Sequence, residues 1–198
     1  MSPKQQRGEA TVERVLAAAL DVYAASGQQG FTVNAVAKGA GVSLGSLYHH
    51  FGSLDGLAAA LYIRCMEQLF DEMVGAVART RTARTGVRAI VVAYLRFTRE
   101  HPDAALFLHA SAYSGYLAAH ADEIRAAKAA KLGALAEWLG PRIISGEIAP
   151  IPSSLIEALV LGPAAEAARR WLSSTYDLDL DQAERILPDR VWRSLQPD

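Results

Sequence analysis

The chain has 198 residues, of which 51% are hydrophobic and 21% charged, and its net charge is −1. This composition predicts a packed globular protein and excludes a disordered chain, while the balanced charge argues mildly against nucleic-acid binding, whose usual sign is a basic surface. No apolar run approaches the ~18 residues of a membrane span, and the N-terminal residues lack the apolar segment of a signal peptide.

Apolar residues recur at helical spacing nearly throughout the chain, and no segment keeps the alternation typical of strands. The first helix is expected over residues 11–26, ending at Gly27. With two short helices that follow, it predicts a three-helix domain over residues 1–53. The expected core of this headpiece is Phe31, Val36, Val42, Leu47 and Phe51.

The segment over residues 31–57 predicts two short helices joined by a tight turn. Thr32 is a typical N-cap of the first helix, and Gly41 can adopt the positive φ that ends it. Ser43 is a typical N-cap of the second helix, and Ser53 of the long helix that follows. Helix, short glycine-containing turn and helix form the helix-turn-helix arrangement, whose second helix can lie in the major groove of DNA. DNA binding is therefore the leading hypothesis.

Residues 54–198 predict a second, larger helical domain. Its helices are expected over residues 54–79, 86–99, from 102 onward, 121–139, 154–173 and 179–195. Pro141 is expected to end the 121–139 helix, and Pro163 and Pro188 to kink or split the last two. Ser154 and Glu157 have the spacing of a capping box. The arginines between residues 79 and 99 are interpreted as solvated charge near a helix end.

The sequence of this helix-turn-helix segment resembles that of TetR/AcrR-type transcriptional regulators of bacteria. The matching elements are Gly30-Phe31-Thr32, Ala37, Ala40-Gly41-Val42-Ser43, Gly45-Ser46-Leu47-Tyr48-His49-His50-Phe51 and Leu57, with a weaker similarity over Leu161-Gly162-Pro163 and Arg169-Arg170-Trp171-Leu172. The chain departs from the family at Leu54, where members commonly carry a Lys that meets a phosphate. The resemblance implies an all-α, ligand-responsive repressor that binds a near-palindromic DNA operator as a homodimer.

The DNA contacts implied by the motif divide into two kinds. Thr32, Ser46, Tyr48 and His50 can donate hydrogen bonds to phosphates. Leu44, Gly45 and His49 are expected to meet base edges, and Asn34 to reach either a phosphate or an edge. The alternative for Tyr48 is that it only braces the helix. Lys4 and Arg7 form either an arm on the DNA backbone or a solvated tail.

The middle of the chain is rich in aromatic and methionine residues, which commonly hold small, largely apolar or aromatic ligands. The residues expected to bind such an effector are Met66, Phe70, Met73, Tyr94, Phe97, His109, Tyr113, Tyr116 and Glu166. The alternative is that these residues form an ordinary core. The last two expected helices carry more large apolar side chains than an exposed pair should show. By resemblance, Leu155, Leu159, Trp171, Ile186 and Trp192 form the dimer interface.

Other functions find little support in the sequence. Ser111 and Ser114 near His109 carry no nucleophile motif, so we expect no enzyme and no cofactor. The histidines lack ligand spacing, so no metal site is expected. Cys65 is expected to be a buried apolar residue, and a lone cysteine predicts a reducing, cytoplasmic location. The remaining alternative is a helical dimeric module that has lost specific DNA binding and acts by ligand or protein interaction.

Overall fold

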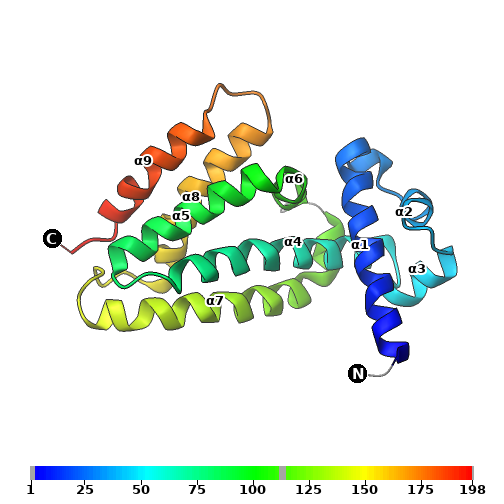
Figure 1. Cartoon of the computed structure of the whole chain (residues 1–198), viewed down its shortest axis with the longest axis horizontal. Coiled ribbons are helices and arrows are strands. Elements are labelled where there is room, and N and C mark those ends of the chain that lie inside the picture. The colour runs from blue at the N-terminus through cyan, green and yellow to red at the C-terminus, as the bar shows by residue number, and fades with distance from the viewer. Residues whose placement is uncertain (1–2, 112–114, 198) are drawn as a thin grey trace. The chain divides into compact units, whose positions relative to one another are not determined.

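The computed structural model of the chain describes residues 3–111 and 115–197. In these ranges the chain is helical and contains no strand, which confirms the all-α prediction. The elements in Figure 1 are α1 (Pro3–Gly30), α2 (Val33–Ala40), α3 (Leu44–Phe51), α4 (Leu54–Val77), α5 (Ala83–Glu100), α6 (Pro102–Ser111), the 3₁₀ helix η1 (Gly115–His120), α7 (Ala121–Ile144), α8 (Ser153–Leu172) and α9 (Leu180–Arg193).

The helices form two compact units. The first contains the described parts of Met1–Cys65 and Leu106–Arg125, and the second those of Met66–Ala105 and Ala126–Asp198. The chain passes from one unit to the other within three helices, α4, α6 and α7. The two units are therefore connected by continuous helical backbone at three places.

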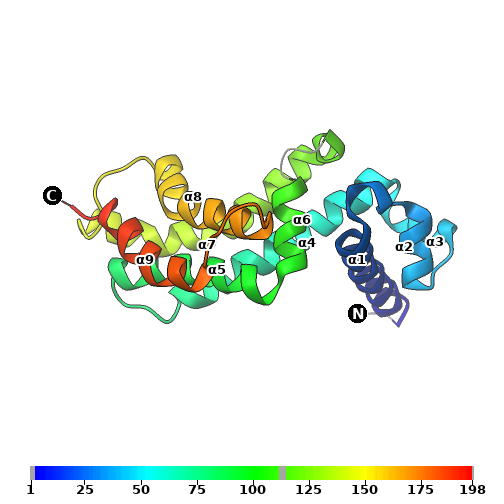
Figure 2. The ribbon, with the colours of Figure 1, turned by 90° about the horizontal axis from the view of Figure 1, so that it is seen from above.

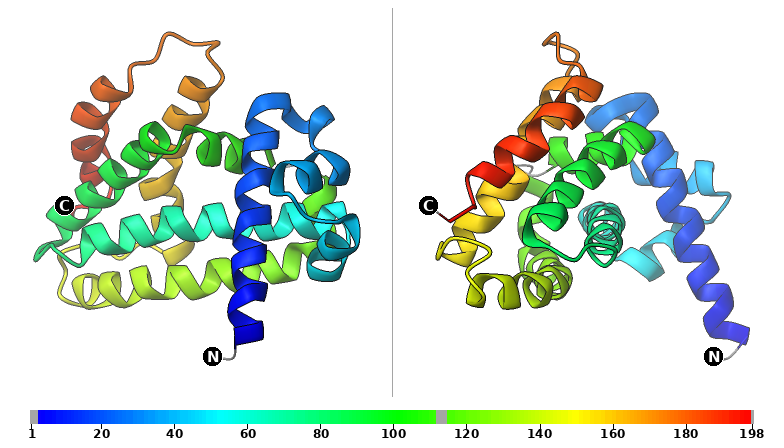
Figure 3. Two further views of the ribbon diagram at one scale, coloured as in Figure 1. Left: turned by 45° about the vertical axis from the view of Figure 1, so that its right-hand side comes forward. Right: turned by 60° about the vertical axis from the view of Figure 1, so that its left-hand side comes forward.

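Helices α2 and α3 form where the local signals predict them (Figure 3). The hydroxyl of Thr32 accepts from the N–H of Ala35 at 3.2 Å, and that of Ser43 accepts from the N–H of Ser46 at 3.1 Å. Between these two caps, Gly41 has φ 63° and ψ 37°, which ends α2 in the left-handed conformation. The first helix is longer than predicted, because α1 already begins at Pro3, but Gly27 interrupts its geometry with φ 62°.

A cluster of three aromatic rings lies in the core of the first unit. Tyr23 of α1 packs edge-on against Phe107 of α6, with ring centroids 4.7 Å apart, and against Phe31 at 5.7 Å. Phe107 is fully buried, although it lies far along the chain from the other two. Of the predicted headpiece core, Phe31, Val36 and Leu47 are buried, and Val42 and Phe51 are half-buried.

The second unit is built on α5, with α8 and α9 at its side (Figure 2). This helix begins earlier than predicted, because Thr82 and Thr85 form a capping box at its N-terminus. The carboxylate of Glu147 also accepts from the N–H of Ala83 at 2.8 Å. Most of α5 is buried, as its apolar surface predicts, including Val87, Ile90, Val91, Leu95 and Phe97.

The predictions for the three helical prolines were wrong in part. Pro141 does not end α7, which continues to Ile144, and neither Pro163 nor Pro188 splits its helix. A proline in a helix removes one hydrogen bond and costs roughly 3 kcal/mol, which tertiary contacts can offset. Beyond Pro141, the guanidinium of Arg142 lies 3.8 Å from the ring centroid of Trp138 and donates to its carbonyl.

Beyond the other two prolines the helices bury further apolar residues, which are Ala164, Ala167 and Ala168 in α8 and Val191 in α9. The predicted capping box of α8 involves Ser154, whose side chain lies outside the described residues. Helix α8 begins at Ser153, after Pro152. The carboxylate of Glu157 accepts instead from Lys128 of α7 at 2.6 Å.

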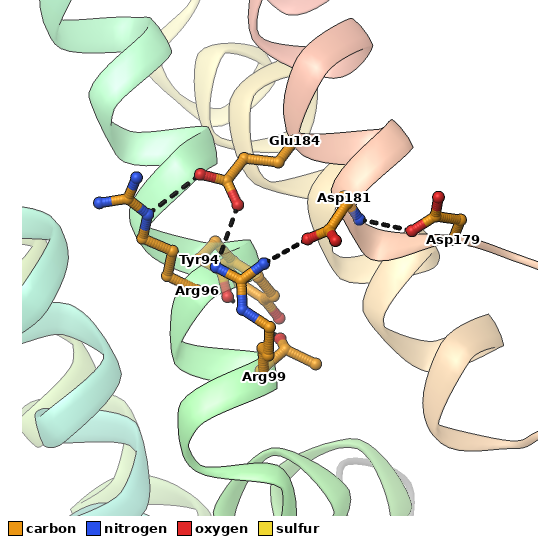
Figure 4. Close-up of polar contacts among 7 residues, drawn as sticks. Tyr94, Arg96, Arg99, Asp179, Asp181 and Glu184 are labelled. Carbon is orange, nitrogen blue, oxygen red and sulfur yellow. Dashed lines mark hydrogen bonds and ion pairs between the residues drawn. The ribbon is translucent and has the colours of Figure 1, made fainter.

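The arginines of α5 are not merely solvated, which corrects the sequence interpretation. Figure 4 shows Arg96 and Arg99 facing the carboxylates of α9. Arg96 meets Glu184 at 3.0 Å, and Arg99 meets Asp181 at 2.6 Å and Glu184 at 3.3 Å. Toward the N-terminus of α5, Asp189 of α9 lies 3.5 Å from Arg84 and 3.4 Å from Arg88. These ion pairs fix α9 along α5, a relation between segments about 90 residues apart that no local pattern in the sequence indicates.

Candidate nucleic-acid interface and ligand cavity

One side of α3 is exposed and holds most of the predicted DNA contacts. Leu44 is 42% exposed and Tyr48 48%, whereas Leu47 on the opposite side is fully buried. Leu44 and Tyr48, like Gly45 and His49, are four residues apart, so all four share one helical face. The side chains of Leu44 and Tyr48 are therefore accessible to a partner that approaches this face.

The other predicted contacts lie at the ends of α2 and α3. Thr32 and Asn34 are exposed at the start of α2, and His50 is exposed in the last turn of α3. Ser46 is half-buried, and its backbone N–H is engaged by the Ser43 cap. Thr32 uses its oxygen as a cap acceptor, so the hydroxyl hydrogen remains to be donated to a phosphate.

The junction between α3 and α4 is sterically tight. The hydroxyl of Ser53 accepts from the N–H of Gly56 at 3.0 Å, which caps α4 as the sequence predicts. A Cβ atom at Gly56 would collide with the carbonyl oxygen of Phe51, so the closeness of the two helices requires glycine there. Leu54, where the family resemblance leads one to expect a Lys, is half-buried in the first turn of α4.

The local charge of this surface differs from that of the whole chain. Residues 31–54 contain one Lys, Lys38, and no Arg, Asp or Glu, so their formal charge is +1. The acidic residues that bring the whole chain to −1 therefore lie outside the helix-turn-helix segment. This segment itself carries no charge that repels phosphates, and the nearest carboxylate along the chain is that of Asp55 in the first turn of α4.

Most of the residues predicted to bind an effector lie in packed core. Met66, Phe70, Met73, Tyr94 and Phe97 are all buried in the second unit. The backbone carbonyl of Tyr94 accepts from the hydroxyl of Thr98 at 3.1 Å (Figure 4).

The polar members of that predicted set lie in different places. His109 is half-buried in the first unit. Tyr113 lies outside the described residues, as does the side chain of Tyr116. Glu166 lies in a shallow groove between α8 and α9, where hydrogen bonds from Arg169 and Arg170 lower its pKa to about 2. Glu166 is thus an ionised surface carboxylate.

A cavity of about 560 Å³ opens in the second unit. It lies between α7 and α8 over α5, and its lining includes Ile90, Leu132, Leu139, Ile143, Ile156 and Val160. Glu157 is the ionisable residue among the described lining residues, and none of them belongs to the set predicted from sequence. The volume falls within the ~300–1,000 Å³ of typical small-molecule sites. The sequence signal for it was weak, because small and aliphatic residues on two helices occur equally in ordinary cores.

The residues predicted to form a dimer interface are not covered within one chain. Leu155 is 54% exposed and Ile186 48%, while Leu159, Trp171 and Trp192 are half-buried. These residues belong to α8 and α9. Their exposure leaves an apolar surface on these two helices.

Three further features bear on other functions. Cys65 is buried, as predicted, and burial raises the pKa of its thiol to about 11. Among the described residues, no cluster of His, Cys, Asp and Glu has the arrangement of a metal site. No helix in the described parts of the chain is long and apolar enough to cross a membrane.

Comparison with known proteins identifies the headpiece. Residues 15–61 match the family described as bacterial regulatory proteins, tetR family. The chain is 26% identical over 121 residues to the HTH-type transcriptional regulator UidR of Escherichia coli (strain K12), covering 54% of this chain and 62% of UidR. It is 29% identical over 92 residues to the uncharacterized HTH-type transcriptional regulator YobS of Bacillus subtilis (strain 168), covering 46% and 48%. The alignments thus span less than two thirds of either relative.

Solved structures share the fold over nearly the whole chain. A TetR family transcription regulator from Marinobacter aquaeolei VT8 is 22% identical, with a TM-score of 0.80 over 98% of this chain and 100% of its own. The transcriptional regulator FadR from Bacillus subtilis, in complex with stearoyl-CoA, is 21% identical, with a TM-score of 0.76 over 90% and 96%. The predicted fold and the resemblance to TetR/AcrR-type regulators are both confirmed.

Proposed function

We propose that this chain, whose headpiece belongs to the tetR family of bacterial regulatory proteins, is a ligand-responsive transcriptional regulator that represses by binding DNA. Residues 1–53 would form the DNA-binding domain, and residues 54–198 the ligand-binding and dimerisation domain. The observation that carries the proposal is the exposed, carboxylate-free face of α3 with Tyr48 and His49 on it.

In the proposed complex, α3 lies in the major groove. Tyr48, His50, Thr32 and Ser46 contact phosphates and so position the helix without reading sequence. Leu44, Gly45 and His49 face the base edges, with Asn34 beside them. The capped N-terminus of α4 offers backbone N–H groups next to Ser53 to a phosphate, while Leu54 supplies no positive charge and Asp55 a negative one.

Two copies of the chain are proposed to pair through α8 and α9. The exposed Leu155 and Ile186, with Leu159, Trp171 and Trp192, would pack against the same residues of a second copy. The two recognition helices would then meet half-sites about one DNA turn, ~34 Å, apart on a near-palindromic operator.

An effector in the second unit is proposed to release the DNA. The cavity between α7 and α8 supports this, and the FadR relative with its bound stearoyl-CoA offers a parallel for a largely apolar effector. Occupation would favour a conformer in which α4 tilts, because α4 carries the chain from the first unit into the second. The two α3 helices would then lose their matching spacing.

A gel shift with DNA from upstream of the protein's own gene tests the proposal. We expect a shift that excess unlabelled upstream DNA abolishes and unrelated DNA does not. The double variant Tyr48→Ala with His49→Ala removes two proposed contacts. Tyr176→Ala, at an exposed tyrosine between α8 and α9, is the matched control. A wild-type protein that binds both DNAs equally well would contradict specific recognition and favour a helical module that acts by ligand or protein interaction.

A further inference from the structure

We propose that the cavity between α7 and α8 binds a linear aliphatic molecule that ends in a neutral hydrogen-bonding group, such as an alcohol or an amide. The inference rests on the proposed ligand-responsive function, whose effector it describes more closely. It also narrows the largely apolar or aromatic effector expected from composition to an aliphatic one.

The residues that line the cavity determine which hydrocarbon portion of a ligand it can hold. The described residues that line the cavity are Leu, Ile, Val, Ala and Gly, together with Glu157, and no aromatic ring is among them. An aromatic ligand would find no ring to stack on and no methionine sulfur to contact. A flexible methylene chain needs only dispersion contacts and removal from water, which aliphatic walls provide over its whole length.

The size of the cavity limits the length of the ligand's methylene chain. Its lining extends along α7 from Ala129 to Ile143, which at 1.5 Å per residue is about 21 Å. A methylene group is close in size to a water molecule, which occupies ~30 Å³ in the liquid. A chain of on the order of ten to fifteen carbons therefore fills most of the 560 Å³.

The charges at the edge of the cavity determine the end group. Nζ of Lys128 lies 2.6 Å from Oε1 of Glu157, and both side chains are partly exposed, at 43% and 36%. A carboxylate head would be repelled by Glu157, and an ammonium head by Lys128. A hydroxyl or amide meets neither repulsion, and it can donate to the carboxylate or accept from the ammonium without separating the pair.

Other contacts hold the walls of the cavity in place. Lys131 of α7 meets Asp71 of α4 at 2.6 Å. Trp138 lies so close to Gly86 of α5 that a Cβ atom there would collide with its ring. Helix α7 is thus attached to α4 and α5, and the ion pair between Lys128 and Glu157 joins it to α8 at the edge of the cavity. When the walls of a site are already ordered, less free energy is spent on ordering them when the ligand binds.

The test is calorimetric titration of the full-length protein, without DNA, using 1-decanol, decanoate, decylamine and 2-naphthol below their aggregation concentrations. We expect 1-decanol to bind more tightly than the other three. Gly133→Leu should weaken its binding by about tenfold or more, since nothing lies within 4 Å of a Cβ at Gly133 and the side chain would fill the cavity. Gly8→Leu, at an equally open helical position in α1, is the matched control and should bind as the wild type does.

Two charge variants test the end group. Glu157→Gln leaves Lys128 unpaired and should shift the preference toward decanoate, whereas Lys128→Gln should shift it toward decylamine. A purely structural ion pair would produce no such exchange of preference. Tightest binding of 2-naphthol, unchanged binding in Gly133→Leu, or identical head-group preference in all variants would each overturn the inference.

Sedimentation of Gly133→Leu separates a ligand site from a contact between copies, since a change in oligomeric state would also overturn the inference. The assays contain no DNA, so their outcome is independent of the gel shift. A protein that binds 1-decanol but not its upstream DNA would retain this site and lose the proposed function.

Discussion

The aromatic cluster of the first unit predicts a large and localised effect of Phe107→Ala. The side chain is fully buried and packs edge-on against Tyr23 at 4.7 Å. Truncation of a buried Phe to Ala costs ~3–5 kcal/mol, of which an edge-to-face pair accounts for ~0.5–1.5 kcal/mol. Since whole domains are stable by only ~5–15 kcal/mol, the variant should lose a large fraction of the first unit's stability.

The positions of the tryptophans allow this effect to be assigned to one unit. Trp138, Trp171 and Trp192 all lie in the second unit, so tryptophan fluorescence reports on that unit while far-ultraviolet circular dichroism reports on both. In urea, Phe107→Ala should acquire an early circular-dichroism transition that the fluorescence does not follow.

Two controls accompany this experiment. Phe107→Leu keeps most of the volume and should show a smaller shift. Phe97→Ala, at a buried site of the second unit, should move the fluorescence transition instead. Coincident shifts of both signals in Phe107→Ala would refute the independence of the units, and no shift in either would refute the packing role of Phe107.

Four further predictions concern DNA contacts, assembly and the buried thiol. Leu54→Lys should tighten DNA binding and add roughly 0.9 to the log–log salt slope for each new phosphate contact, so an unchanged slope in a salt titration would mean that this position does not face the backbone. Tyr48→Phe should weaken binding to all DNA sequences alike, whereas His49→Ala should relax preference at one or two base positions, and binding-site selection would reveal reversed roles. Ile186→Glu should give helical monomers in sedimentation, because the two-fold axis places the buried charge in the interface twice, and a variant that stays dimeric would locate the interface elsewhere. Cys65 should resist alkylation at pH 8 in the folded protein, and because its pKa is raised from 9.0 to about 11, the free energy of unfolding should fall as pH rises between these values. Rapid alkylation without unfolding would contradict its burial.

The features predicted correctly from sequence are those with local causes. The caps at Thr32, Ser43 and Ser53 involve partners three residues away, and Asp179 caps α9 through Asp181, so each cap is visible in a short window. The left-handed Gly41 depends only on the absence of a side chain. The helix-turn-helix segment could therefore be predicted nearly to the residue, whereas α1 begins and ends outside its predicted bounds.

The features missed from sequence depend on distant partners. Pro141 signals a helix end locally, but Arg142 and Trp138 stabilise the continuation. The aromatic and methionine residues of the second unit were predicted to surround an effector, yet Phe70 and Phe97 are buried in core. Cores and apolar sites draw on the same residue types, so composition alone does not separate them.

The charge distribution shows why a net charge near zero is a poor guide to this protein's partners. The four arginines of α5 pair with Asp181, Glu184 and Asp189 of α9, so most of their charge is offset within the second unit. Residues 31–54, which hold the proposed DNA contacts, carry Lys38 and no carboxylate, so their formal charge is +1 whatever the total. With so few cations, one headpiece should release few counterions and bind DNA weakly by itself. Useful affinity then requires two headpieces on one operator, because the second contact is made at a high effective concentration. The exposed apolar surface of α8 and α9 is thus as necessary to the proposed function as the face of α3.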